Sequence, residues 1–298
     1  MSNSDLYKSL LSELTGKLHV LKDKPEETPE STLRALWLAS AGINASAESS
    51  VNFRLPDLTG DQIKTLQHFI ELRLNNKPLA HITHRQNFLG LDMISDQRAL
   101  IPRKETEILG KKALDLSRKM SDSKEEITVL DVCCGSGNLG IALAYYNSSA
   151  RVYAADISEE AVSLTRENIR FLNLGDRITA IQSDLLAGFE PDEFYGKTDL
   201  LICNPPYIQS SKVQKMDSEI ASFEPDLAFD GGMLGIKIIQ RLIKDAPDFL
   251  ISGGWLAFEV GLGQGDFIGQ LCQRSGAFGK IEQIPDESGN TRVICLQK

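Results

Sequence analysis

The segment that most constrains this chain is a short apolar run, Asp199–Cys203, which ends at Asn204-Pro205-Pro206-Tyr207. Such a run is typical of a buried strand in a parallel sheet. Neither proline has an N–H to donate to a neighbouring strand, so we expect the strand to end at Asn204. A residue before proline is held in the extended region and two consecutive prolines are stiff, which fixes the Asn204 amide relative to the Pro205 carbonyl.

Two neighbouring oxygen acceptors of this kind can hold a single NH₂ group. The nitrogen of a planar amide or aromatic amine is a poor nucleophile, because its lone pair is delocalised. Accepting both of its N–H bonds orients the nitrogen and stabilises the positive charge that it gains while attacking a methyl donor. Tyr207 is placed to stack on the planar group. By itself the tetrad fits a proline-rich turn with a buried tyrosine better, so other motifs have to decide.

Composition bounds the class of protein. The chain has 298 residues, of which 42% are hydrophobic, and this is enough for a large core and two domains. No stretch approaches the ~20 apolar residues of a membrane span, and the first residues lack the pattern of a signal peptide. We therefore expect a cytoplasmic protein without a membrane partner. The five cysteines have no paired CxxC spacing, which predicts reduced thiols in the core.

The distribution of charge bears on possible partners. The net charge of −9 arises entirely after residue 85, since the first 85 residues contain ten basic and ten acidic side chains. An acidic region without a stripe of Lys and Arg is poorly suited to bind a phosphate backbone, so nucleic acid is disfavoured as a substrate. His81 and His84 have no carboxylate or cysteine spacing that completes a metal site, so no metal is predicted.

Two domains and a linker are expected. Residues 1–85 are predicted to form a small helical domain, because apolar residues recur every three to four positions over 4–23, 31–41 and 61–74. Residues 86–102 are predicted to form a linking β-hairpin, with strands at Phe88–Met93 and Leu100–Ile101 around a turn at Ser95-Asp96. Residues 103–298 form the second predicted domain, which begins with a helix over 103–120.

From residue 127 onward, strands alternate with helices, which is the pattern of a doubly wound α/β sheet. Strands are predicted over 127–132, 151–155, 178–182, 199–203 and 255–260, and helices over 139–146, 159–172 and 235–250. The tail differs, since strands over 279–284 and 292–296 are joined by a short polar turn that suits an antiparallel hairpin.

A glycine-rich loop, Cys133–Gly140, follows the first strand of the sheet and opens a helix. Glycines let the backbone approach a ligand closely, and the helix N-terminus attracts a carboxylate or phosphate. This pattern alone does not distinguish a dinucleotide site from an S-adenosylmethionine site. Asp156 and Asp184 end the next two strands, where they are placed to meet ribose hydroxyls and an adenine edge.

The end of the fourth strand favours S-adenosylmethionine. Asn204 and Pro205 offer acceptors to an NH₂ group at the point where a dinucleotide enzyme needs room for nicotinamide or flavin. The antiparallel tail also suits a methyltransferase better than a dehydrogenase. An acidic pocket further stabilises a sulfonium donor.

Taken together, these motifs resemble the class I S-adenosylmethionine-dependent methyltransferases, and within them the HemK/PrmC protein-(glutamine-N5) methyltransferases that modify peptide chain release factors. The resemblance runs from about residue 77 to the C-terminus. The residues that carry it are Pro78–Thr83, Phe88–Leu91, Leu100–Glu107, the glycine-rich loop, Asn204–Ile208, Glu224-Pro225, Phe229–Gly232 and Gly289–Val293.

The resemblance implies roles for individual residues. Asn204, Pro205 and Tyr207 act in catalysis, and with Pro206 and Phe88 they hold the glutamine side-chain amide. The helical N-terminal domain helps to recognise the release factor. The predicted cofactor-binding residues are Asp131, Cys133, Gly135, Gly137, Asp156, Ile157, Asp184, Leu185, Asn204 and Arg103.

The chain departs from the family pattern at three places. Lys104 replaces the usual proline of Arg-Pro-Glu-Thr-Glu, Cys133-Cys134 replaces a Gly-Thr-like pair, and His84–Gln86 replaces a glycine-containing turn. Other readings stay open: a paralogue that N-methylates a free amino acid or other small metabolite, a nucleic-acid adenine N-methyltransferase, a dinucleotide oxidoreductase, or a cofactor-binding module without activity. Cys134 and Cys203 lack an adjacent basic partner, which predicts inert packing.

Overall fold

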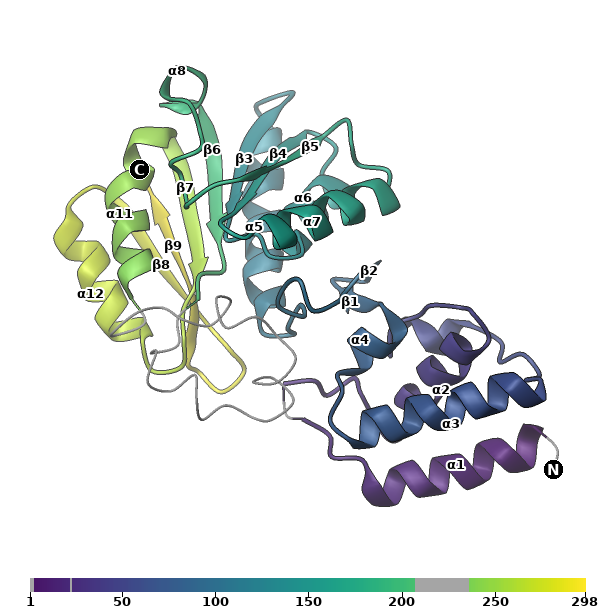
Figure 1. The fold of residues 1–298 in the computed structure, drawn as a ribbon. Coiled ribbons are helices and arrows are strands. Elements are labelled where there is room, and N and C mark those ends of the chain that lie inside the picture. Colours follow the sequence, from purple (N-terminus) through teal and green to yellow (C-terminus); the bar gives the residue numbers. More distant parts are fainter. Residues whose placement is uncertain (1–2, 22, 207–235) are drawn as a thin grey trace. The chain divides into compact units, whose positions relative to one another are not determined.

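The computed structural model describes residues 3–21, 23–206 and 236–298, and these form two compact units (Figure 1). The first unit contains the described residues up to 97 together with 101–104. The second contains residues 98–100 and everything described from 105 onward. Within these ranges, no helix combines the length and the apolar character that crossing a membrane requires.

The first unit is built from helices around an apolar core. Its helices are α1 (Asn3–Lys17), α2 (Pro29–Ser40), the short 3-10 helix η1 (Ser49–Asn52), α3 (Gly60–Leu74) and α4 (Leu79–Thr83). Trp37 of α2 and Leu66 of α3 belong to this core and are almost completely buried. Thr28 caps α2 through its side chain, and Thr59 begins a capping box at α3, so both helices start where the chain supplies a hydroxyl acceptor.

A β-hairpin completes the first unit. Strands β1 (Gln86–Phe88) and β2 (Leu91–Met93) are antiparallel, and Leu89 and Gly90 form the turn with φ angles of 51° and 85°. Two positive φ angles are typical of the turn whose twist matches the flanking strands. The predicted turn at Ser95-Asp96, with Leu100–Ile101 as second strand, is therefore wrong, because the single predicted strand 88–93 itself contains the turn.

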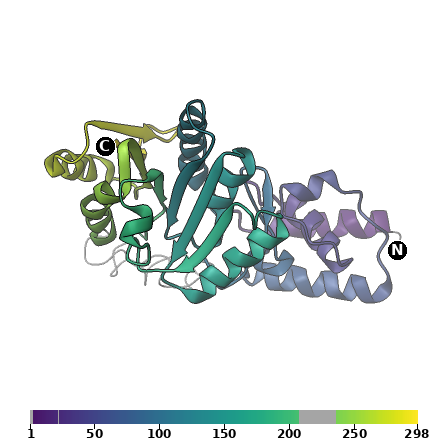
Figure 2. The same cartoon turned by 90° about the horizontal axis from the view of Figure 1, so that it is seen from above.

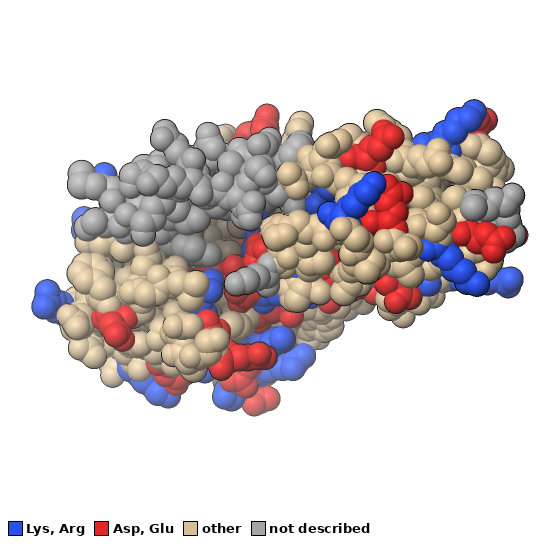
Figure 3. Space-filling view, turned by 90° about the horizontal axis from the view of Figure 1, so that it is seen from below, with Lys and Arg blue, Asp and Glu red and all other residues tan. Residues whose placement is uncertain are grey.

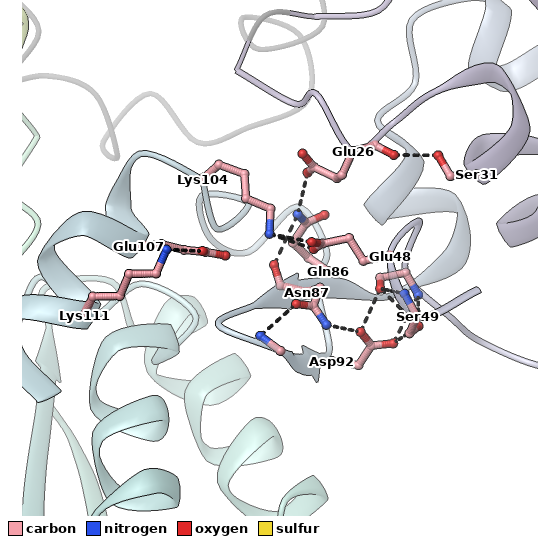
Figure 4. Close-up of polar contacts among 12 residues, drawn as sticks. Glu26, Ser31, Glu48, Ser49, Gln86, Asn87, Asp92, Lys104, Glu107 and Lys111 are labelled. Carbon is pink, nitrogen blue, oxygen red and sulfur yellow. Dashed lines mark hydrogen bonds and ion pairs between the residues drawn. The ribbon is translucent and has the colours of Figure 1, made fainter. Parts of the chain in front are cut away.

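The carboxylate of Asp92 fixes this hairpin within its unit (Figure 4). It accepts hydrogen bonds from the N–H and hydroxyl of Ser46 (3.2 and 2.7 Å), from the Ser49 hydroxyl, and from Asn87 Nδ2 (2.9 Å). Close by, Lys104 Nζ lies 2.8 Å from each carboxylate oxygen of Glu48. Lys104, which departs from the family pattern, is thus tied to the segment that also holds Asp92.

The second unit is a mixed α/β structure. Its elements are α5 (Thr106–Ser121), β3 (Ile127–Val132), α6 (Asn138–Tyr146), β4 (Ala150–Asp156), α7 (Glu159–Phe171), β5 (Ile178–Gln182), α8 (Pro191–Phe194), β6 (Thr198–Cys203), α11 (Lys237–Phe249), β7 (Leu250–Glu259), α12 (Gly265–Ser275), β8 (Lys280–Pro285) and β9 (Thr291–Gln297).

Seven strands form one sheet in the order β5-β4-β3-β6-β7-β9-β8. The first five in this order are parallel, whereas β9 runs antiparallel to both β7 and β8. The predicted class I methyltransferase fold, a doubly wound sheet with an antiparallel C-terminal hairpin, is therefore confirmed. Helices α8 and α12 are additional to the predicted elements.

The sheet has helices on both faces (Figures 1 and 2). Leu130 of β3, Leu201 of β6 and Leu256 of β7 belong to one buried cluster with Leu242 of α11 and Ile268 of α12. Helix α6 contacts both α5 and α7, and these three helices pack on the opposite face. Since side chains alternate along a strand, the residues next to these leucines face α5, α6 and α7.

Candidate functional site

The carboxyl ends of three parallel strands bring many of the predicted site residues together. β3 lies between β4 and β6, with Val132 opposite both Ala155 and Cys203. The glycine-rich loop therefore begins beside Asp156, which ends β4, and beside Asn204, which follows β6. In an open α/β sheet, ligands bind at this edge.

The glycine-rich loop has a tightly turned backbone. Cys133, Gly135 and Gly137 have φ angles of 57°, 56° and 82°, all in the left-handed region. A side chain at Gly137 would place its Cβ 2.7 Å from Thr165 Cγ2, so this position requires glycine for space as well as for conformation. The loop leads into α6, whose first N–H groups and dipole can hold an anionic group.

Three polar side chains outside the loop hold its backbone. Asp156 Oδ2 accepts a hydrogen bond from the Gly135 N–H (2.9 Å). The Thr165 hydroxyl donates to the Gly135 carbonyl (2.8 Å), and Asn168 Nδ2 donates to the Ser136 carbonyl (3.1 Å). Neither Thr165 nor Asn168 is among the site residues predicted from the sequence. A signal for them exists, because they are fully buried polar residues three apart on the apolar face of α7.

Two acidic side chains lie beside the loop. Asp131 is fully buried and accepts the Gly140 N–H through Oδ2 (2.8 Å); burial raises its pKa to about 7, and the charge of Asp156 adds to the effect. Burial also raises the pKa of Asp156, against the lowering effect of backbone N–H groups such as that of Ser158 (3.0 Å). A cation bound nearby would favour the ionised form of both carboxyl groups.

The end of β5 is arranged differently. Asp184 is half exposed and forms a bidentate ion pair with Arg241 of α11, in which both N–O distances are 3.0 Å. Such an exposed pair contributes little to stability, so it leaves the carboxylate available for exchange. Leu185 is buried with a φ of 54°, and Ile157 after β4 is half exposed. Contacts of these three residues with a cofactor stay predictions.

The segment after β6 carries the predicted amide-binding residues. Asn204 is half-buried and Pro205 is buried. Asn204 Nδ2 donates to the Thr106 hydroxyl at the start of α5 (3.2 Å), and in the described part of the chain this is the only hydrogen bond of the Asn204 side chain. The Asn204 Oδ1 and Pro205 carbonyl oxygens thus have no protein partner within those ranges. Pro206 follows, and Tyr207 lies outside the described residues.

Two predicted site residues belong to the first unit. Phe88 is the last residue of β1 and is 1% exposed. Arg103 is also buried, and its Nη1 lies 3.7 Å from Asp23 Oδ2 within the same unit. The predicted role of Phe88 in enclosing the reactive centre and that of Arg103 in cofactor binding stay predictions.

Two buried cysteines near the site, Cys134 and Cys203, are not activated. Burial raises the pKa of the Cys134 and Cys203 thiols well above the ordinary value, so neither is a thiolate at neutral pH. His81 is buried in the first unit, which lowers its pKa to about 4. Across residues 3–21, 23–206 and 236–298, no group of three or more His, Cys, Asp or Glu side chains is placed to hold a metal ion.

Comparison with known proteins decides the family. The release factor glutamine methyltransferase of Moorella thermoacetica is 36% identical over 229 residues, which cover 77% of this chain and 78% of that protein. The chain belongs to this methyltransferase family. The release factor glutamine methyltransferase of Caulobacter vibrioides matches over a longer span, with 29% identity over 96% of this chain and 95% of that protein.

Two further matches agree with the family at a coarser level. The model of the methyltransferase small domain matches residues 112–223. Among solved structures, the hMettl16 catalytic domain in complex with a 3′UTR hairpin has a TM-score of 0.55 at 14% identity, covering 83% of this chain and 85% of that chain. At this identity the likeness concerns the fold alone. The family assignment therefore rests on the sequence relatives.

The surface charge of the described residues is mixed. On the face of the molecule in Figure 3, Lys and Arg side chains are interspersed with Asp and Glu, and those that the structure describes form no continuous basic stripe. The net charge of −9 agrees with this pattern. The described part of this face therefore offers no continuous basic surface to a phosphate backbone.

Proposed function

We propose that this chain transfers a methyl group from S-adenosylmethionine to the side-chain amide nitrogen of a glutamine in a peptide chain release factor. One observation carries the proposal: the glycine-rich loop and the Asn204-Pro205 acceptors follow strands that pair with each other, Val132 with Cys203. A donor in the loop and an amide on the acceptors would therefore be neighbours. Family membership supplies the expected substrate.

The residues at the loop suit such a donor. The N-terminus of α6 fits a carboxylate, and Asp156 fits ribose hydroxyls. Asp131 Oδ1 is buried and, within the described ranges, accepts no hydrogen bond; a positively charged sulfur bound nearby would favour the ionised form of this carboxyl group. When bound, S-adenosylmethionine supplies a methyl group on a sulfonium centre, which departs as a neutral thioether.

The chain's own contribution to the chemistry is alignment and charge stabilisation. Asn204 Oδ1 and the Pro205 carbonyl accept the two N–H bonds of the substrate amide and direct its lone pair at the methyl carbon. The positive charge that develops on this nitrogen is stabilised by the same two oxygens. The surplus proton then leaves to water, so no strong base is required. Tyr207 is proposed to pack over the amide plane.

Recognition of the release factor is proposed to involve residues 1–85, with residues 86–102 linking them to the methyltransferase domain over 103–298. Because release factors act in translation, the proposed substrate implies a cytoplasmic location. The helical architecture of the first unit and its balanced charge are consistent with protein recognition.

Labelled S-adenosylmethionine tests this function directly. The purified chain is incubated with a release factor, with the same factor carrying Gln→Ala at the modified position, with a pool of small metabolites, and with DNA. Label on the intact release factor and on no other sample is expected. Label on a metabolite or on DNA would instead reveal the corresponding alternative, and binding of NAD without methyl transfer would reject the proposal altogether.

A further inference from the structure

The side-chain amide of Asn204 has an acceptor oxygen and a donor NH₂ group, and the proposed function requires the oxygen to face the substrate. The substrate NH₂ group is a donor, so it needs the amide oxygen of Asn204. An asparagine amide has nearly the same shape when rotated by 180°, and the rotated form would place NH₂ against NH₂. Packing alone does not select between the two forms, so the hydrogen-bond partner that holds this side chain bears on catalysis.

Thr106 is that partner. Its hydroxyl accepts Asn204 Nδ2 at 3.2 Å across a sequence separation of 98 residues. The side chain is 1% exposed, so water does not compete freely for this position. In the structure the hydroxyl accepts the Nδ2 N–H of Asn204, and this orientation leaves Oδ1 for the substrate.

The position of Thr106 is itself fixed. Thr106 is the first residue of α5 and follows the cap residue Glu105. Arg292 of β9 places its Nη2 3.8 Å from Glu105 Oε1 and 3.4 Å from Oε1 of Glu259, the last residue of β7. Arg292 is 8% exposed, and Glu259 is 1% exposed. The start of α5 is therefore attached to two central strands of the sheet by a largely buried ion-pair network.

We propose that Thr106 is a positioning residue, whose hydrogen bond with Nδ2 holds the Asn204 side chain in place and presents Oδ1 to the substrate nitrogen that receives the methyl group. This inference rests on the proposed function of Asn204 and adds the group that makes Asn204 competent. Thr106 acts on turnover and not on donor affinity, since its contact is with Asn204 and not with the glycine-rich loop.

The test compares Thr106→Val, which keeps the shape and removes the hydroxyl, with Thr106→Ser, which keeps the hydroxyl. Thr106→Val is expected to lower kcat with the release factor about tenfold, in keeping with the loss of one buried hydrogen bond. S-adenosylmethionine Kd should stay within twofold of the parent value. Thr106→Ser should recover kcat to within about threefold of the parent.

A double-mutant cycle separates positioning from general damage. In an Asn204→Ala background, Thr106→Val should have no further effect on kcat, because nothing remains to orient. A full tenfold loss in that background would show that Thr106 acts by another route and would overturn the inference. So would a kcat of Thr106→Val equal to that of the parent.

Thr198→Val serves as the matched control. Thr198 is a fully buried threonine at the start of β6, the strand that ends next to Asn204. The Thr198→Val variant should have the kcat of the parent. Melting curves of all variants identify any that fail to fold. If Thr106→Val fails to fold, Thr106→Ser decides alone. A kcat of Thr106→Ser as low as that of Asn204→Ala would then contradict the proposal. Absence of turnover by the parent chain would reject the proposed function instead, so the two failures are distinguishable.

Discussion

The loop after β3 and the segment after β6 begin at paired residues, Val132 and Cys203, yet their backbones are fixed by different means. The loop depends on positive φ angles and on three side chains from β4 and α7. Among the described residues, the segment after β6 depends on two prolines and a single side-chain hydrogen bond, from Asn204 to Thr106. The proposed donor site is thus held by several contacts, whereas the described part of the proposed acceptor site is held by one.

This difference predicts where single substitutions act. Removing one of several contacts around the loop should weaken donor binding by degrees, because the others remain. Removing Asn204 should abolish most of the chemistry in one step while leaving the donor site intact. The experiments below try to break this contrast, beginning with the largest expected effect.

The largest effect is expected for Asn204→Ala. Loss of one of two acceptors that stabilise developing charge should reduce kcat by about 10²-fold to 10³-fold, as for other polar groups aimed at a transition state. S-adenosylmethionine Kd, measured by calorimetry, should change less than twofold. Asn147→Ala is the control, because Asn147 donates to Ser117 and Ser121 at the other end of α6 and should alter stability alone. Equal losses in kcat and donor affinity would contradict the contrast.

Gly137→Ala should act mainly on the donor. The substitution forces a left-handed φ of 82° on alanine and places Cβ 2.7 Å from Thr165 Cγ2, so the loop has to shift. We expect donor Kd to rise at least tenfold and the free energy of unfolding to fall by roughly 2–4 kcal/mol. Gly196→Ala is the matched control, since its φ is 64° but nothing lies within 4 Å of the added Cβ. Unchanged donor affinity in Gly137→Ala would argue against the loop as the donor site.

Thr165→Val should have a smaller effect of the same kind. It removes the hydroxyl that donates to the Gly135 carbonyl (2.8 Å) and leaves that oxygen without this donor. The cost should be about 1–3 kcal/mol in the free energy of unfolding, with donor Kd raised several-fold and kcat nearly constant. Chemical denaturation and calorimetry measure these quantities. A selective loss of kcat would show that the loop and the acceptor site are coupled more closely than the contrast allows.

The smallest effect on turnover is expected for Asp131→Asn, which instead changes the pH dependence of stability. Burial raises the pKa of Asp131 from 3.8 to about 7, so the folded chain binds this proton more tightly than the unfolded chain. Its contribution is fully present below about pH 4 and is lost as pH rises to about 7. Asp131→Asn should remove this decline, because an amide side chain does not titrate. The amide oxygen can still accept the Gly140 N–H, so the loop contact is kept. Identical stability profiles of variant and parent between pH 4 and 8 would refute the assignment.

Much of the sheet could be predicted from the sequence, because inner strands such as β3 are mostly buried and form apolar runs, whereas the edge strand β5 alternates apolar and polar residues. The predicted strands over 127–132 and 178–182 coincide with β3 and β5. The predicted turn of the hairpin in the first unit is wrong, because the observed turn uses Leu89, and leucine rarely adopts a positive φ angle. Helix α12 contains Gly265 and Gly269, which weaken the helical pattern.

The residues of the candidate site likewise divide into those that can be predicted from the sequence and those that cannot. Motif residues such as Gly135, Asp156 and Asn204 are recognisable because their chemistry is local to a strand end. The contact of Thr106 with Asn204 could not be predicted from the sequence, because it depends on how α5 packs against the sheet. Buried polar partners of this type become visible only when the fold places distant segments together.

The inner position of β9 has a consequence for how the chain acquires its structure. Residues 291–297 pair with β7 on one side and β8 on the other, and Ile294 and Leu296 are fully buried. A chain made from its N-terminus therefore presents the unpaired edge of Trp255–Glu259 until this strand has been synthesised. A chain that ends before residue 291 should consequently aggregate through this exposed edge, and should not form a smaller stable enzyme.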